Sequence, residues 1–145
     1  MACTVLLMAA SCSKSKTEKE PDKSCSSGDE VGFVLNNPFL LCWNYSIPDV
    51  SQNFQVGFKK VVEDSRCPTD VDCVRAGTAL VALVFSHNGE IIIDTLGIGD
   101  VFGTSYSDST FFAGYKIKLL EVLPAPISTN QPTEADYKVK LLITN

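Results

Sequence analysis

The feature that most constrains this 145-residue chain is a period-two alternation of apolar and polar side chains in its C-terminal half. Residues 115–119 and 137–143 carry aromatic or aliphatic side chains at every second position, mostly with lysines between them. Successive side chains of a strand point to opposite faces, so these segments predict half-buried strands. Residues 54–58 alternate in the same way. No segment of useful length has helical spacing, which favours an antiparallel all-β fold.

Residues 78–85 differ because both faces of the predicted strand are apolar, which is typical of a central strand covered on two sides. Asn88 and Gly89 follow and predict a tight hairpin, because both tolerate a positive φ. The returning strand is expected at 90–96 and a turn at 97–100. Other extended segments are expected at 31–35, 39–45, 101–105, 110–123 and 137–143. Seven or eight strands predict an antiparallel β-sandwich, with a small β-barrel as the alternative.

The N-terminus predicts export and lipid attachment. Residues 1–11 are uncharged and mostly apolar, too few to span a bilayer but enough for the core of a signal peptide. Small residues precede Cys12, an arrangement that resembles the lipobox of bacterial lipoproteins. The resemblance implies cleavage before Cys12, lipidation of Cys12 and attachment to the outer membrane of the cell envelope, facing the periplasm or the exterior. Residues 12–30 are rich in Ser, Lys and acidic residues and predict a flexible tether.

Charge and length limit the remaining possibilities. Twelve basic and 17 acidic residues give a formal net charge of −5. This balance argues against nucleic acid as a partner, which calls for a basic surface, and against electrostatic attachment to anionic lipid. The lipid on Cys12 is therefore the expected membrane contact. Residues 31–145 have a suitable length for one domain with a real core.

The cysteine pattern predicts disulfide bonds. Six cysteines are present, of which one lies in the signal and one is the lipidation site. Four remain for the domain, which are Cys25, Cys42, Cys67 and Cys73. An even number in an exported domain favours disulfides, and we expect Cys67–Cys73 and Cys25–Cys42 because each pair is nearest in sequence. The spacing of Cys67 and Cys73 argues against a four-thiolate zinc site and against a thiol oxidoreductase.

Residues 62–77 form the most distinctive internal segment, Val-Glu-Asp-Ser-Arg-Cys-Pro-Thr-Asp-Val-Asp-Cys-Val-Arg-Ala-Gly. The segment resembles a motif of small exported bacterial lipoproteins, of the Bacteroidetes type, that have no assigned activity. The matching positions are Asp64, Ser65, Arg66, Cys67, Pro68, Val71, Cys73, Val74, Ala76 and Gly77. The family commonly has Trp where this chain has Arg75. The resemblance covers much of residues 54–145 and implies a fold and a location, not a reaction.

The side chains of this segment predict a stapled turn between two strands. Pro68 fixes φ and suits the start of a turn, while Asp70 and Asp72 are expected to accept hydrogen bonds from nearby backbone N–H groups. Arg66 is expected to pair with Asp64 or to reach the carbonyls of a neighbouring loop. The structural role is favoured over a catalytic one.

Metal-binding and catalytic alternatives are weaker. Glu63, Asp64, Asp70 and Asp72 offer the oxygen ligands that calcium prefers, but they lack the full spacing of a calcium loop, so no cofactor is expected. His87 is the single histidine and lies beside the predicted hairpin turn, where a solvent-facing polar residue is ordinary. A mechanism that needs a histidine base is therefore not expected.

Aromatic and basic side chains are also assigned to the fold. Trp43, Tyr45, Phe111 and Phe112 are expected in the core or on strand faces rather than around a ligand. The lysines at 116, 118, 138 and 140 are expected on a solvated sheet face, where they discourage edge pairing.

Three functions are compatible with these patterns. The first is a non-enzymatic, lipid-anchored binding or structural module whose partner is a protein or a glycan. The second is an exported enzyme inhibitor that inserts the Cys67–Cys73 loop into its target, since a preorganised loop loses little entropy on binding. The third is a hydrolase, which requires a cleft with convergent acid, base or metal groups. Protrusion of the Cys67–Cys73 loop favours the second over the first.

The lipobox resemblance generates a direct prediction. Cys12→Ala removes the thiol that would carry lipid, so the protein is expected to move from the membrane fraction to the soluble fraction. Cell fractionation with immunoblotting measures this change. Unchanged fractionation, or an intact Met1 in mass spectrometry of the mature protein, would contradict lipid anchoring.

Overall fold

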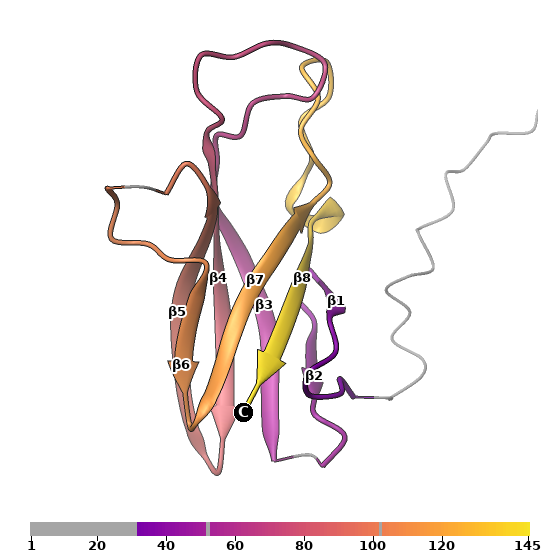
Figure 1. Ribbon diagram of the computed structural model, residues 1–145. Helices are drawn as coiled ribbons and strands as arrows, with labels where there is room; N and C mark the ends of the chain where they lie inside the picture. The colour runs from indigo at the N-terminus through magenta and orange to yellow at the C-terminus, as the bar shows by residue number, and fades with distance from the viewer. Residues whose placement is uncertain (1–31, 52, 102) are drawn as a thin grey trace, which may run out of the picture.

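The computed structural model describes residues 32–51, 53–101 and 103–145 (Figure 1). Two antiparallel four-stranded sheets face each other, with strand orders β1-β8-β7-β6 and β2-β3-β4-β5. They do not close into a barrel, and the predicted β-sandwich is confirmed. The predicted signal peptide, the tether, Cys12 and Cys25 lie outside the described residues.

Eight strands make up the two sheets. They are β1 (Phe39–Cys42), β2 (Ser46–Pro48), β3 (Phe54–Asp64), β4 (Thr78–His87), β5 (Glu90–Gly99), β6 (Ser109–Phe112), β7 (Tyr115–Leu123) and β8 (Lys138–Thr144). A short 3-10 turn, η2 (Glu134–Asp136), precedes β8. Among the described residues, no helix is long and apolar enough to cross a membrane.

The expected first strand at 31–35 is wrong for the part that the structure describes. Phe33 makes only an isolated bridge to Asp49. Its ring stacks on Phe39, with centroids 4.7 Å apart, and meets Phe54 edge-on. The segment therefore contributes one buried aromatic side chain to the core instead of a row of backbone hydrogen bonds.

The expected turn at 97–100 is also wrong, because β5 continues to Gly99. Gly97 pairs with Leu80 of β4, and a Cβ added at Gly97 would lie 2.6 Å from Leu80 Cδ2 and 3.0 Å from Val101 Cγ1. The glycine therefore serves close packing within a strand. The expected extension at 101–105 is wrong for the described residues 101 and 103–105, because the Val101 carbonyl accepts hydrogen bonds from the Thr104 N–H and hydroxyl.

Two other expected segments are each split by residues with positive φ. Ala113 and Gly114, with φ of 52° and 85°, break 110–123 into the hairpin of β6 and β7. Asn44, with φ of 60°, breaks 39–45, so that β1 and β2 join different sheets. The predicted hairpin at Asn88 and Gly89 is present, with positive φ at both residues.

The core lies between the sheets and follows the period-two pattern. The inward residues of β4 are fully buried, and they pack with those of β3, β7 and β8. The opposite face of β4 is also covered: Leu80 and Ala82 are buried although they point away from the core. The segment after β5 folds back over this face, where Val101 and Tyr106 approach Gly97. The apolar character of both faces in 78–85 therefore has a structural cause.

The two ends of the sandwich differ in their connections (Figure 1). One end carries the tight turns at 88–89 and 113–114 and the turn at 50–51 that follows β2. Phe33 bridges Asp49 there, so the chain also enters the domain at this end. The other end carries the long connections 65–77, 100–108 and 124–137. We call it the loop end.

Burial in β7 generates a matched prediction. Leu119 is 1% exposed and its neighbour Leu120 is 37% exposed. Leu119→Ala is expected to lower the free energy of unfolding by about 3 kcal/mol, because it removes core contacts and leaves a cavity. Leu120→Ala is expected to cost less than about 1 kcal/mol. Urea denaturation of both variants measures the difference, and equal losses would contradict the assigned faces of β7.

Candidate functional site

The base of the loop end is built around Arg66, which follows β3. Its guanidinium donates two parallel hydrogen bonds to the Asp64 carboxylate, from Nε to Oδ1 at 2.8 Å and from Nη2 to Oδ2 at 2.7 Å. The Tyr137 hydroxyl donates to the same carboxylate at 2.9 Å. Both members of the ion pair are largely buried. Buried charges of this kind are costly unless they are fully paired, and this pair is well matched in geometry.

Arg66 also reaches the other sheet. Its Nη1 donates to the Val122 carbonyl at 2.5 Å and its Nη2 to the Pro124 carbonyl at 2.9 Å. Pairing with Asp64 and contact with a neighbouring loop were expected as alternatives, and the structure shows both. One side chain therefore joins the end of β3 to the end of β7, across the two layers of the sandwich.

The network shifts the pKa values of its acidic members. Burial raises the pKa of Asp64, but hydrogen bonds from Arg66 and Tyr137 and the charge of Arg66 outweigh it, so the pKa lies below its ordinary value. The stabilisation from this carboxylate is therefore present above the unfolded pKa of about 3.9 and is lost in acid. Burial and the hydrogen bond to Asp64 raise the pKa of Tyr137 to about 12.

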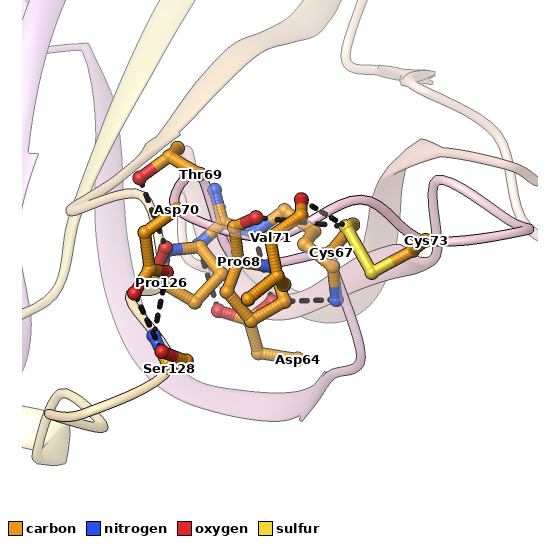
Figure 2. Close-up of a disulfide and its surroundings, with 10 residues drawn as sticks. Asp64, Cys67, Pro68, Thr69, Asp70, Val71, Cys73, Pro126 and Ser128 are labelled. Atoms are coloured by element: carbon orange, nitrogen blue, oxygen red, sulfur yellow. Dashed lines mark hydrogen bonds and ion pairs between the residues drawn. A yellow bond between two sulfur atoms is a disulfide. The ribbon is translucent and has the colours of Figure 1, made fainter.

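The predicted disulfide between Cys67 and Cys73 is present and closes the loop above this base (Figure 2). Below it, the Cys67 N–H donates to the Ala76 carbonyl at 2.8 Å, and the Ser65 N–H donates to Thr78 at 2.8 Å. Gly77 has φ of +70°, and a Cβ there would lie 1.9 Å from the Ser65 carbonyl oxygen. Glycine is therefore required where the loop returns into β4.

A second loop supports the first (Figure 2). The Thr69 N–H donates to the Pro126 carbonyl at 2.9 Å. The Asp70 carboxylate accepts hydrogen bonds from the Ser128 N–H at 2.8 Å and from the Ser128 hydroxyl at 2.5 Å. These bonds lower the pKa of Asp70. Asp70 was expected to accept a hydrogen bond from a nearby backbone N–H, and the donor is Ser128, 58 residues further along the chain.

The tip of the loop is exposed. Residues 69–76 are all exposed, Val71 is about half exposed and Val74 is fully exposed. Arg75 pairs with Asp100 of the next connection at 3.2 Å, on the surface. The loop therefore combines a fixed base with an exposed tip, in which two valines lie among charged residues. It projects beyond the sheets in Figure 1.

The residues considered as metal ligands or as a catalytic base do not form a common site among the described residues. Among the described residues, no group of three or more His, Cys, Asp or Glu side chains could hold a metal ion. Of the four acidic residues considered as calcium ligands, Asp64 binds Arg66 and Asp70 binds Ser128. Their carboxylate oxygens are therefore used in contacts within the protein. His87 lies at the opposite end, where its Nδ1 is 2.8 Å from the Asn53 carbonyl oxygen.

The four aromatic candidates divide between core and surface. Phe112 is buried and Trp43 packs against the core, whereas Tyr45 and Phe111 are exposed. Phe111 lies under the ammonium group of Lys116, at 5.8 Å from the ring centroid. Phe111 and Lys116 are paired across β6 and β7 on the outer face of their sheet.

Cys42 forms a disulfide bond. The partner predicted from the sequence, Cys25, lies outside the described residues, so the pairing of these two cysteines stays a prediction.

Sequence reasoning missed the partners that lie far along the chain. Tyr137, Ser128 and Asp100 complete the loop end, yet each looks ordinary in the sequence. One signal was available for Tyr137. It occupies an apolar position of the period-two pattern at the start of a strand, where its hydroxyl needs a buried partner.

The Tyr137 contact predicts a loss of stability in alkali. The unfolded phenol ionises near pH 10 and the folded one near 12, so unfolding becomes easier as the pH rises through this window. The free energy of unfolding is expected to fall by roughly 2–3 kcal/mol from this group. Tyr137→Phe should abolish that component, whereas Tyr45→Phe, at an exposed position, should retain it. Urea denaturation at a series of pH values tests the difference, and identical profiles for the two variants would refute the role of Tyr137.

Comparisons of this chain with protein-family models, with curated proteins and with solved structures find no match.

Proposed function

We propose that this protein is a lipid-anchored module of the bacterial outer membrane that binds a protein partner through its loop end, without catalysing a reaction. The observation that carries the proposal is the Cys67–Cys73 loop, which has a fixed base and an exposed tip that includes Val71 and Val74. The small exported lipoproteins that the motif resembles give the same location. Anchoring through Cys12 and the tether at 12–30 belongs to the proposal.

The position of the chain's entry supports presentation of this loop to a partner. The chain enters the sandwich at the end of the tight turns, and the Cys67–Cys73 loop lies at the opposite end (Figure 1). A tether attached to lipid at Cys12 would therefore join the domain at its turn end. The loop end would then lie away from the point of attachment and stay accessible to a partner.

The contacts of the loop lower the entropy cost of binding at its tip. The disulfide, the Arg66 hydrogen bonds and the Asp70–Ser128 pair restrict the loop before any partner arrives, so little conformational entropy is lost on binding. Val74 is fully exposed, and its burial in a partner's pocket would contribute about 1.5 kcal/mol. Val74 therefore offers a partner one apolar contact on a restrained loop.

The charged groups at the base favour binding over catalysis. Asp64, Arg66 and Asp70 are committed to contacts that hold the loop. A general acid or base must be able to exchange a proton with a substrate, and these groups instead hold each other or the backbone. Asp64 and Asp70 therefore serve the shape of the loop.

The projecting tip also favours the second candidate, an inhibitor of an exported enzyme. Such an inhibitor needs a convex, preorganised loop that fits a concave cleft. The loop meets the geometric condition because it extends beyond both sheets. Thr69, Asp70 and Arg75 contact the neighbouring loops, and Val74 stays fully exposed. In this form of the proposal the partner is an enzyme, and Val74 occupies its cleft.

Site-specific photo-crosslinking in the cells that produce the protein tests the proposal. A photoreactive amino acid at Val74 is expected to form a discrete adduct with a partner protein. The same group at Val50, which is 60% exposed at the turn end, should form no such adduct. The double variant Cys67→Ser/Cys73→Ser should lower the yield at Val74, because the loop loses its closure. The absence of an adduct at Val74, or equal adducts at both positions, would contradict binding through the loop end.

A further inference from the structure

The four sheet edges are protected to different degrees. The edge strands β1 and β6 have four residues each, and β2 has three and ends in Pro48. Short strands and proline are common protections of an edge, because an unpaired edge accepts strands from other chains. The fourth edge strand, β5, has ten residues. It is the exception among the described strands.

Half of the β5 edge is already covered. The Gly97 N–H donates to the Ser107 carbonyl at 2.9 Å, and Leu96 forms an isolated bridge with Ser107. The Gly97 N–H therefore points away from β4. The pairing of β5 with β4 has no register shift, so the backbone groups of residues 91, 93 and 95 point outward as well. The Thr95 N–H is capped by Asp94 Oδ1 at 2.8 Å.

The uncovered half presents the backbone of Ile91 and Ile93. The side chains of these two residues are 66% and 62% exposed, and they lie on the outer face beside Ser86 and Val84 of β4. Outward N–H and C=O groups, combined with exposed apolar side chains at alternate positions, match the requirements of an added β-strand. An added strand gains backbone hydrogen bonds and covers the isoleucines at the same time.

The charges next to the isoleucines decide which strand fits. In the antiparallel register that brings Ile91 of one copy opposite Ile93 of another, Glu90 faces Asp94 at both ends. Like charges directly opposite each other destabilise a strand pair. A second copy of this chain is therefore disfavoured. A strand with Lys or Arg at these two positions and apolar residues opposite the isoleucines would be complementary to the same edge.

We propose that the segment Glu90–Asp94 of β5 is a second docking site, which takes an extended segment of a partner protein with alternating basic and apolar residues. The site is independent of the loop end and does not require the function proposed above. The partner strand would pair antiparallel with β5 and extend the sheet β2-β3-β4-β5 by one strand. Asp94 and Ser107 would limit the site to the first half of β5.

The probe is the peptide acetyl-Thr-Lys-Val-Thr-Val-Lys-Thr-amide, titrated into the isotope-labelled full chain and followed by amide NMR and hydrogen exchange. The amide signals of Ile91 and Ile93 are expected to shift in a saturable manner, and their exchange should slow. A peptide with Glu in place of both Lys residues, and one with both Val nitrogens methylated, should each bind at least about tenfold more weakly. The first control removes the charge match and the second removes hydrogen bonds to the Ile91 and Ile93 carbonyls.

Protein variants complete the test. Ile93→Lys should lose binding of the basic peptide, whereas Val50→Lys, a matched change at an exposed valine at the turn end, should keep it. If Ile93→Lys does not fold, the methylated peptide decides alone. Shifts that map to residues 69–76, equal binding of all three peptides or no saturable shift would overturn the proposal. Concentration-dependent dimers through β5 in sedimentation would overturn it too, because the occupant would then be a second copy.

Discussion

The arrangement of the loop end depends on one buried side chain, the guanidinium of Arg66. It neutralises Asp64 at the end of β3 and also binds two carbonyls at the end of β7, so the two sheets are joined at the point where both give way to loops. The sheets elsewhere meet through apolar contacts, which are non-directional. The bidentate pair adds direction. It sets where the chain leaves β3, and the disulfide and the contacts with Ser128 then build on that position.

The strands were predictable because alternation reports burial, and burial dominates the energy of this fold. The both-sided apolar run at 78–85 became the central strand β4, as expected. The predicted strand boundaries were wrong where a residue type occurs both in turns and within strands. Gly97 resembles a turn residue in the sequence, yet it lies within a strand because Leu80 and Val101 pack against it. In the candidate site, contacts between residues close in sequence were predictable and contacts between distant segments were not. The short-range contact of Arg66 with Asp64 was foreseeable, whereas Ser128 and Tyr137 come from distant segments that only the folded chain brings near.

The two proposed surfaces, the loop end and the open half of β5, require partners of different shape. The loop end offers a convex, fixed tip, and its recognition would depend on a complementary hollow. The open half of β5 offers backbone groups in a line, and its recognition would depend on an extended segment. Ser107 and the Asp94 cap shorten this line, while Glu90 and Asp94 oppose pairing between copies. Such protection would matter most under the proposed lipid anchoring, because neighbouring copies on a membrane would meet often.

The contacts between Asp70 and Ser128 have a consequence for how the loop can vary. They bind the connection after β3 to the connection after β7, so the bases of the two loops form one body. A residue inserted in either base would displace the other connection as well. Val71, Asp72 and Val74 escape this restriction, because their side chains are exposed and the disulfide at Cys73 can be kept when they change. New binding specificities can therefore be engineered by changing these tip residues, with the two sheets left intact.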